Sequence, residues 1–197
     1  MRLTYLLLLG MLSSGAAAAP EFSADIVSRT ASGMDLRASA RLFVANGKVR
    51  IETAAAAAGY FLVDGTAAIF VHPERQIFTD ARQSTPLTRI FLAVDPANPC
   101  PQWQAAAQNA GDNGEWSCER ITTREYNVAA SRRWIDAHLQ FPVRFRAADG
   151  TTLTLEHIRV GTQPAGLFTV PASYRKSDPR ALIERLKQSD VWVEPPK

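Results

Sequence analysis

Hydrophobic and polar residues alternate along most of this chain, and short turn motifs separate the alternating segments. The clearest pattern spans residues 34–52, where two such segments flank Asn46-Gly47, a dipeptide typical of two-residue hairpin loops. The loop length sets the strand register, and residues two apart share a face. This register places four apolar residues on one face of the hairpin, namely Leu42, Val44, Val49 and Ile51.

The other face of this hairpin carries charged and aromatic residues. The register sets Arg41 opposite Glu52 and Phe43 opposite Arg50. These placements predict an ion pair and a cation–π contact, each worth about 0.2–1 kcal/mol. Because an isolated hairpin is only marginally stable, we expect further elements to cover its apolar face.

Further alternating segments predict a sheet of many strands. Residues 60–71 form a second hairpin that is apolar on both faces, which is typical of strands covered on both sides. In residues 142–160, a three-residue loop ending at Gly150 pairs Phe145 with Leu153. The other expected strands span residues 22–30, 76–79, 120–128, 132–139 and 167–170.

Helical spacing interrupts the strand pattern. Thr85 can cap a helix that begins at Pro86. Two further short helices are expected over residues 101–110 and 178–188. The first helix carries an apolar stripe made of Leu87, Ile90, Phe91 and Val94.

These elements predict a mainly β fold of the α+β class. A long antiparallel sheet twists and curls rather than staying flat. We therefore expect a curved sheet that forms an incomplete barrel, with short helices covering its concave face.

The first 18 residues have the pattern of a secretory signal peptide. Arg2 precedes an apolar run that is too short to span a membrane, and small residues follow at Ala16–Ala19. We expect cleavage after Ala18 and a single domain over residues 19–197. The mature protein is then exported, to the periplasm of a bacterial envelope, and does not span the membrane.

The cysteine content agrees with export, and the charge content bears on the class of partner. Cys100 and Cys118 are the two cysteines, and an even count in an exported protein predicts a disulfide. The formal net charge of +3 is small, and the basic residues are scattered along the chain. This balance argues against a nucleic-acid partner.

The sequence contains no recognisable catalytic or metal-binding motif. His72, His138 and His157 lie far apart, without metal-ligand spacing. Asp136 and His138 share a strand face, yet no GxSxG elbow supplies a nucleophile, and no glycine-rich phosphate loop is present. We expect no enzymatic activity and no cofactor.

The surplus of apolar residues is more informative. Two interpretations stay open: a sealed core, or a cavity for acyl chains with the first helix as its lid. The ten residues assigned to this hypothetical cavity are Leu42, Val44, Val49, Ile51, Phe61, Ile69, Leu87, Ile90, Phe91 and Val94.

The order of these segments resembles a known family. The segments that carry the likeness are FSADIV, RLFVANGKVRIE, IFVHPERQ, RRWIDAHLQFPVRF and the closing GTQPAGLFTVPASYRK. Together they resemble the LolA/LolB-like superfamily of periplasmic lipoprotein carriers with its RseB-like relatives, in a branch of undefined function. The resemblance covers nearly all of the mature chain.

The resemblance implies an incomplete barrel whose hydrophobic cavity binds a lipid or the acyl chain of a lipoprotein, a role in outer membrane biogenesis. One departure is Ala45, since the carriers bear an arginine there that is tied to lid closure. The alternative is an envelope protein-interaction or stress-sensing module of the RseB kind, with a sealed core and a protein partner.

Overall fold

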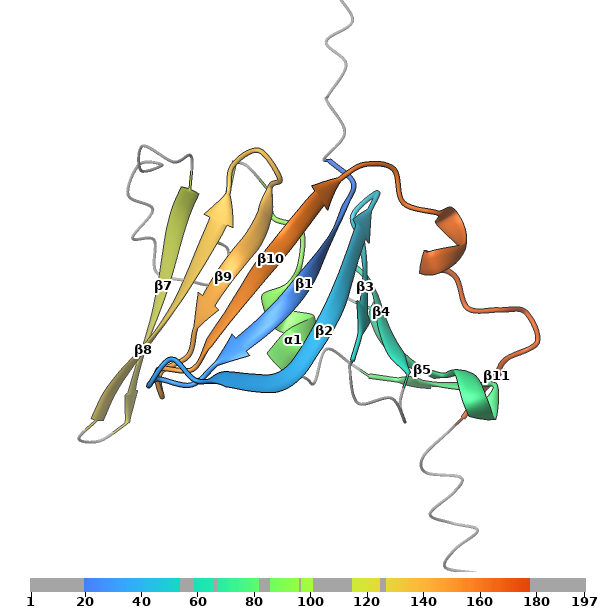
Figure 1. Ribbon diagram of the computed structural model, residues 1–197, viewed down its shortest axis with the longest axis horizontal. Coiled ribbons are helices and arrows are strands. Elements are labelled where there is room, and N and C mark those ends of the chain that lie inside the picture. The colour runs from blue at the N-terminus through green and yellow to red at the C-terminus, as the bar shows by residue number, and fades with distance from the viewer. Residues whose placement is uncertain are drawn as a thin grey trace, which may run out of the picture.

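The fold is one large curved sheet, seen here in a computed structural model (Figure 1). The structure describes residues 20–53, 59–65, 67–81, 86–95, 97–100, 115–124 and 127–177. The expected signal peptide and the helices expected over residues 101–110 and 178–188 lie outside these residues. The elements are β1 (Phe22–Arg29), β2 (Asp35–Ala45), β3 (Lys48–Glu52), β4 (Tyr60–Asp64), β5 (Ala67–His72), η1 (Pro73–Arg75), β6 (Ile77–Asp80), α1 (Pro86–Ile90), β7 (Glu115–Arg124), β8 (Asn127–Asp136), β9 (Phe141–Arg146), β10 (Thr152–Val160), η2 (Ala165–Phe168) and β11 (Arg175–Lys176).

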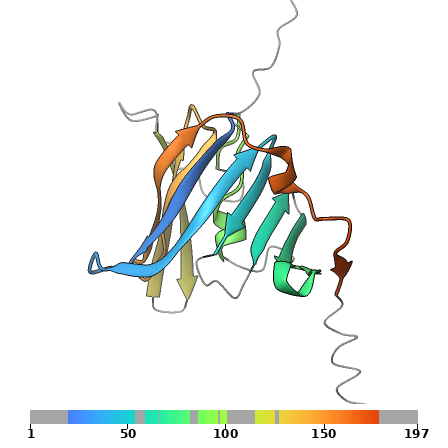
Figure 2. The same cartoon turned by 45° about the vertical axis from the view of Figure 1, so that its right-hand side comes forward.

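The strands form a single eleven-stranded sheet in the order β11-β6-β5-β4-β3-β2-β1-β10-β9-β8-β7. The pairing of β1 with β10 joins the two halves of the chain. Neighbouring strands are antiparallel except for β11, which pairs in parallel with β6. The sheet curves around α1 and its described edges do not pair with each other, as the two views show (Figure 2). The prediction of an incomplete antiparallel barrel is confirmed.

The first predicted hairpin has the expected register. β2 and β3 pair Leu42 with Ile51 and Val44 with Val49. Asn46 and Gly47 both have positive φ, at 50° and 74°, as a type I′ turn requires. The third hairpin also matches, since Leu153 pairs with Phe145 and Gly150 has φ of 84°.

The side-chain partners on the outer face of the first hairpin differ from the prediction. Arg41 forms its ion pair with Asp25 on β1, at 3.9 Å. Glu52 is instead bound by Arg50, two residues before it on the same strand, at 2.7 Å. The sequence predicts pairing across β2 and β3. Arg41 instead pairs with the residue opposite it on its other neighbour, β1, and Arg50 pairs along its own strand.

The helix on the concave face is shorter than predicted. The apolar stripe suggested a helix through Val94, but α1 ends at Ile90. The backbone N–H of Val94 donates to Gln140 O, 3.1 Å away in the turn between β8 and β9. A tertiary hydrogen bond thus replaces the one that a longer helix would have used.

Residues 161–177 form an outer layer over β3, β4 and β5 (Figure 1). The strand expected over residues 167–170 is wrong, because Ala165–Phe168 is a 3₁₀ helix and the pairing strand is β11, further along the chain. This layer buries the second face of the hairpin formed by β4 and β5, as its two apolar faces predicted. The buried residues of this outer cluster are Tyr60, Leu62 and Val71, packed against Ile69, Phe78, Val170 and Tyr174.

Candidate functional site

The concave face of the sheet is lined by the hydrophobic core. Six of the ten residues assigned to the hypothetical cavity are buried there together, and Phe61 and Leu87 pack against them partly buried. The six are Leu42, Val44, Val49, Ile51, Ile90 and Phe91. Strand alternation explains this gathering, since these residues of β2 and β3 all point to the side on which α1 lies.

The other two residues assigned to the cavity, Ile69 and Val94, do not pack with the concave-face core. Their assignment to one common cavity is therefore corrected. Ile69 pairs with Leu62 and packs in the outer cluster, because it lies one residue from Ala68, whose side chain faces the core. Val94 packs against the disulfide and Ile135, since α1 ends before it.

Aromatic residues that the sequence did not assign to the site complete the concave face. Phe91 is fully buried and lies parallel to Phe141, with ring centroids 6.5 Å apart. Phe141 in turn meets Phe22 edge to face at 5.3 Å. Phe22 and Phe141 are the first residues of β1 and β9. The alternation of apolar and polar residues in these strands indicates that both side chains face the core. The contact itself depends on the pairing of β1 with β10 and β10 with β9.

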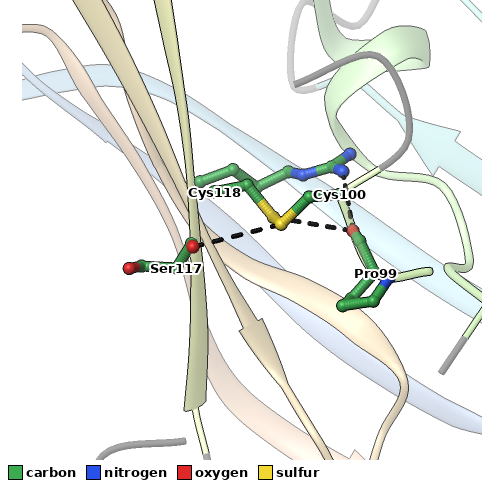
Figure 3. Close-up of a disulfide and its surroundings, with 5 residues drawn as sticks. Pro99, Cys100, Ser117 and Cys118 are labelled. Carbon is green, nitrogen blue, oxygen red and sulfur yellow. Dashed lines mark hydrogen bonds between the residues drawn. A yellow bond between two sulfur atoms is a disulfide. The ribbon is translucent and has the colours of Figure 1, made fainter. Parts of the chain in front are cut away.

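The predicted disulfide joins Cys100 to Cys118, with the two Cα atoms 5.6 Å apart (Figure 3). Cys118 Sγ lies 3.5 Å from Pro99 O, and Arg133 Nη2 donates to the same oxygen at 3.2 Å. Burial lowers the pKa of Arg133 to about 10, so its guanidinium stays charged at neutral pH. The disulfide therefore ties the segment that follows α1 to β7, at one end of the concave face.

An apolar hollow lies on the outer face of the sheet. It measures about 180 Å³, and Lys48 and Asp64 contribute to its rim with their ion pair at 3.3 Å. Its apolar wall consists of Leu62, Ala67, Ile69, Phe168 and Val170. This hollow separates part of η2 from β4 and β5.

Arg50 holds the outer layer against the sheet. Only 14% of its side chain is exposed, and its Nη1 donates to Leu167 O at 3.0 Å. Its guanidinium lies 3.5 Å from the centre of the Tyr60 ring, and Nε donates to Glu52 at 2.8 Å. The sequence predicts a contact of Arg50 with Phe43, the residue opposite it on β2. It could not show the contact with Leu167, because that residue lies more than a hundred positions further along the chain.

Replacing Arg50 with alanine is expected to lower the free energy of unfolding by about 2 kcal/mol, because hydrogen bonds to a charged group and the ring contact are lost together. Residues 161–177 should also become more susceptible to limited proteolysis. The matched control is Lys48→Ala on the same face of β3, whose exposed ion pair should cost below about 1 kcal/mol. Equal losses for the two variants in urea unfolding would contradict the assigned role of Arg50.

The three histidines lie in different parts of the fold. His72 packs edge to face against Phe70, with ring centroids 4.6 Å apart, and His138 lies in the turn that follows β8. Asp136 Oδ1 accepts hydrogen bonds from the backbone N–H groups of His138 and Leu139, both at 2.8 Å, so this carboxylate stabilises a turn. Within the described residues, no three His, Cys, Asp or Glu side chains gather as they would around a metal ion. In that same part of the chain, no helix has the length and apolar character needed to cross a membrane.

The geometry defines an open, curved antiparallel sheet whose concave face is covered by a short helix. The chain matches no protein-family model and no curated protein sequence. Among solved structures, it is similar to part of PNGF-II, with a TM-score of 0.54 at 6% identity over 84% of this chain and 32% of that one. This chain thus spans about a third of PNGF-II, and at such identity the likeness concerns the fold alone.

Two smaller proteins of similar extent are also among the matches. An uncharacterized conserved protein from Thermus thermophilus has a TM-score of 0.47 at 13% identity, over 81% of this chain and 90% of that chain. The LolA superfamily protein NE2245 from Nitrosomonas europaea has a TM-score of 0.40 at 10% identity, over 77% and 90% respectively.

Proposed function

We propose that this protein is an exported, periplasmic, non-enzymatic protein that binds a lipid, or the acyl chain of an acylated protein, on the concave face of its sheet. The observation that carries the proposal is the cover of that face. In the described residues, α1 has only five residues, yet it lies over the apolar face of an open eleven-stranded sheet. Withdrawing α1 would uncover an apolar surface made by Leu42, Val44, Val49 and Ile51.

The character of α1 supports a movable cover. A helix this short is not stable in isolation, so its contacts with the core hold it in place. Beyond α1, the Val94–Gln140 hydrogen bond and the disulfide at Cys100 anchor the chain. An acyl chain that replaced Phe91 and Leu87 in the core would gain about 0.8 kcal/mol for each buried CH₂ group.

Ligand binding can be tested first on protein isolated from its own host. Native mass spectrometry of the mature protein, followed by organic extraction, is expected to reveal a bound mass that extracts as a phospholipid or an acylated species. A fluorescent fatty acid should then bind the delipidated protein and be displaced by that extract. An apo mass together with no probe binding would contradict the proposal.

The location of the ligand is tested by two matched variants. Leu87→Ala, at the contact of α1 with the core, is expected to change the probe affinity several-fold, by about 1 kcal/mol. Ile69→Ala, in the outer hollow, is expected to leave it unchanged. The reverse result would place the ligand in the outer hollow and overturn the assignment to the concave face.

The runner-up is a protein-interaction or stress-sensing module with a sealed core. The specific observation in its favour is the close packing of the concave face, where Leu42, Ile51 and Phe91 are each 0% exposed. Crosslinking in the envelope would then capture a protein partner, and the extraction experiment would yield no lipid.

A further inference from the structure

A polar hollow lies on the outer face of the central strands, opposite the core. It measures about 190 Å³. It lies on the face opposite buried Ile26, Ala40 and Leu42, so it is independent of any ligand on the concave face. Its lining residues are Ser23, Ala24, Asp25, Arg41, Phe43, His157 and Arg159.

A β-bulge brings His157 into this hollow. Ser23 pairs with Arg159 and Asp25 with Glu156, so His157 and Ile158 together lie opposite the single residue Ala24. His157 has φ of 51°, in the left-handed region that is disfavoured for residues other than glycine. A bulge of this kind re-aims a side chain, and such backbone is retained where the surroundings enforce it.

Asp25 orients two of the three basic side chains. His157 Nδ1 lies 3.1 Å from Asp25 Oδ2, and Arg41 Nε lies 3.9 Å from Asp25 Oδ1. Because an ionised carboxylate only accepts hydrogen bonds, the proton of His157 lies on Nδ1 and Nε2 is turned away from Asp25.

The charge of the hollow is positive. Arg41 and Arg159 outnumber the single carboxylate of Asp25, and His157 adds a further nitrogen donor when it is protonated. The side chains of His157 and Asp25 are 70% and 40% exposed, so their contact contributes little to stability.

We propose that this hollow binds a phosphate group carried on a small organic ester. The guanidinium groups of Arg41 and Arg159 donate to the phosphate oxygens in the two-pronged geometry that arginine favours. When its ring is protonated, His157 donates a third hydrogen bond through Nε2. The ring of Phe43 packs against the carbon part of the ester. The same chemistry recognises a free phosphate ester and a phospholipid headgroup.

The test uses the mature protein and two probes. Binding of glycerol 3-phosphate is followed by amide chemical shifts in NMR, with an expected Kd of about 1 mM. Binding to phosphatidylcholine vesicles, with and without phosphatidylglycerol, is followed by co-sedimentation at about 0.15 M salt, which screens unspecific attraction. Binding of the soluble ester alone identifies a free phosphate ester as the ligand, whereas binding to the phosphatidylglycerol vesicles identifies a lipid headgroup.

Three variants separate a built site from general charge. Arg41→Gln and His157→Gly are each expected to weaken binding about tenfold. His157→Gly should leave the melting temperature unchanged or raise it, because glycine adopts this φ without steric cost. Lys48→Gln makes the same charge change as Arg41→Gln on neighbouring β3, outside the hollow, and should have no effect. The proposal is overturned if neither probe binds, or if Lys48→Gln weakens binding as much as Arg41→Gln.

Discussion

Replacing Phe91 with alanine is expected to lower the free energy of unfolding by about 3–5 kcal/mol. The side chain is fully buried and packs parallel to Phe141 at the centre of the concave face. Its removal loses the transfer free energy of the ring and leaves a cavity that the surrounding strands fill only in part. Since domains of this size are stable by about 5–15 kcal/mol, the variant is expected to remain folded but close to the limit. Urea unfolding at 25 °C, followed by circular dichroism, measures the loss.

The next residue provides the matched control. Leu92 is only partly buried against the same core, so Leu92→Ala is expected to cost about 1–2 kcal/mol. If α1 covers a ligand-binding face, Phe91→Ala should also increase uptake of the fluorescent fatty acid, whereas Leu92→Ala should not. A loss below about 1 kcal/mol for Phe91→Ala would contradict the packing described for the concave face.

Reducing the Cys100–Cys118 disulfide is expected to cost about 3 kcal/mol, the second-largest effect. The bond closes a loop of 18 residues in sequence separation, and opening it releases conformational freedom in the unfolded chain. For a protein of this size, the loss corresponds to a fall of roughly 6–12 °C in Tm. Thermal unfolding with and without reductant measures it.

Comparison with a cysteine-free protein separates the crosslink from packing. The reduced protein keeps both buried side chains, whereas the double variant Cys100→Ala with Cys118→Ala also removes their sulfur atoms from the cluster with Ile135. We expect the double variant to be slightly less stable than the reduced protein. Equal unfolding midpoints for oxidised and reduced protein would show that the bond does not constrain the fold.

The oxidised and the reduced protein together also test how α1 is anchored. The disulfide and the Val94–Gln140 hydrogen bond hold the segment that follows the helix. Reduction is therefore expected to speed hydrogen exchange at the amides of Phe91 and Val94. Exchange in β2 and β3, at the centre of the sheet, should change less.

Local patterns along the chain were enough to predict much of the fold. Alternation with period two and the Asn46-Gly47 turn set the register of β2 and β3, because a short loop leaves a hairpin a single pairing. The three-residue loop at Gly150 did the same for β9 and β10. The disulfide followed from the even number of cysteines in a chain with an expected signal peptide.

The candidate sites could be predicted only in part. Six apolar residues of the concave face were identified, because the spacing of apolar and polar residues along each strand or helix indicates which side chains face the core. Ile69 was assigned to the wrong layer, since β4 and β5 are apolar on both faces and the pattern cannot say which side faces which layer. The polar hollow around His157 was missed, because the bulge that forms it depends on the pairing of β10 with β1.

The sequence on its own specifies the turns, the alternation of the strands, the start of α1 and the pairing of the cysteines, since each depends on neighbouring residues or on composition. The tertiary structure decides where α1 ends, which carbonyl Arg50 binds and which side chains meet across the concave face. Those outcomes depend on contacts between segments far apart in the chain, such as Arg50 with Leu167 and Val94 with Gln140. Such contacts form only when the curved sheet brings the segments together, and no short stretch of residues encodes them.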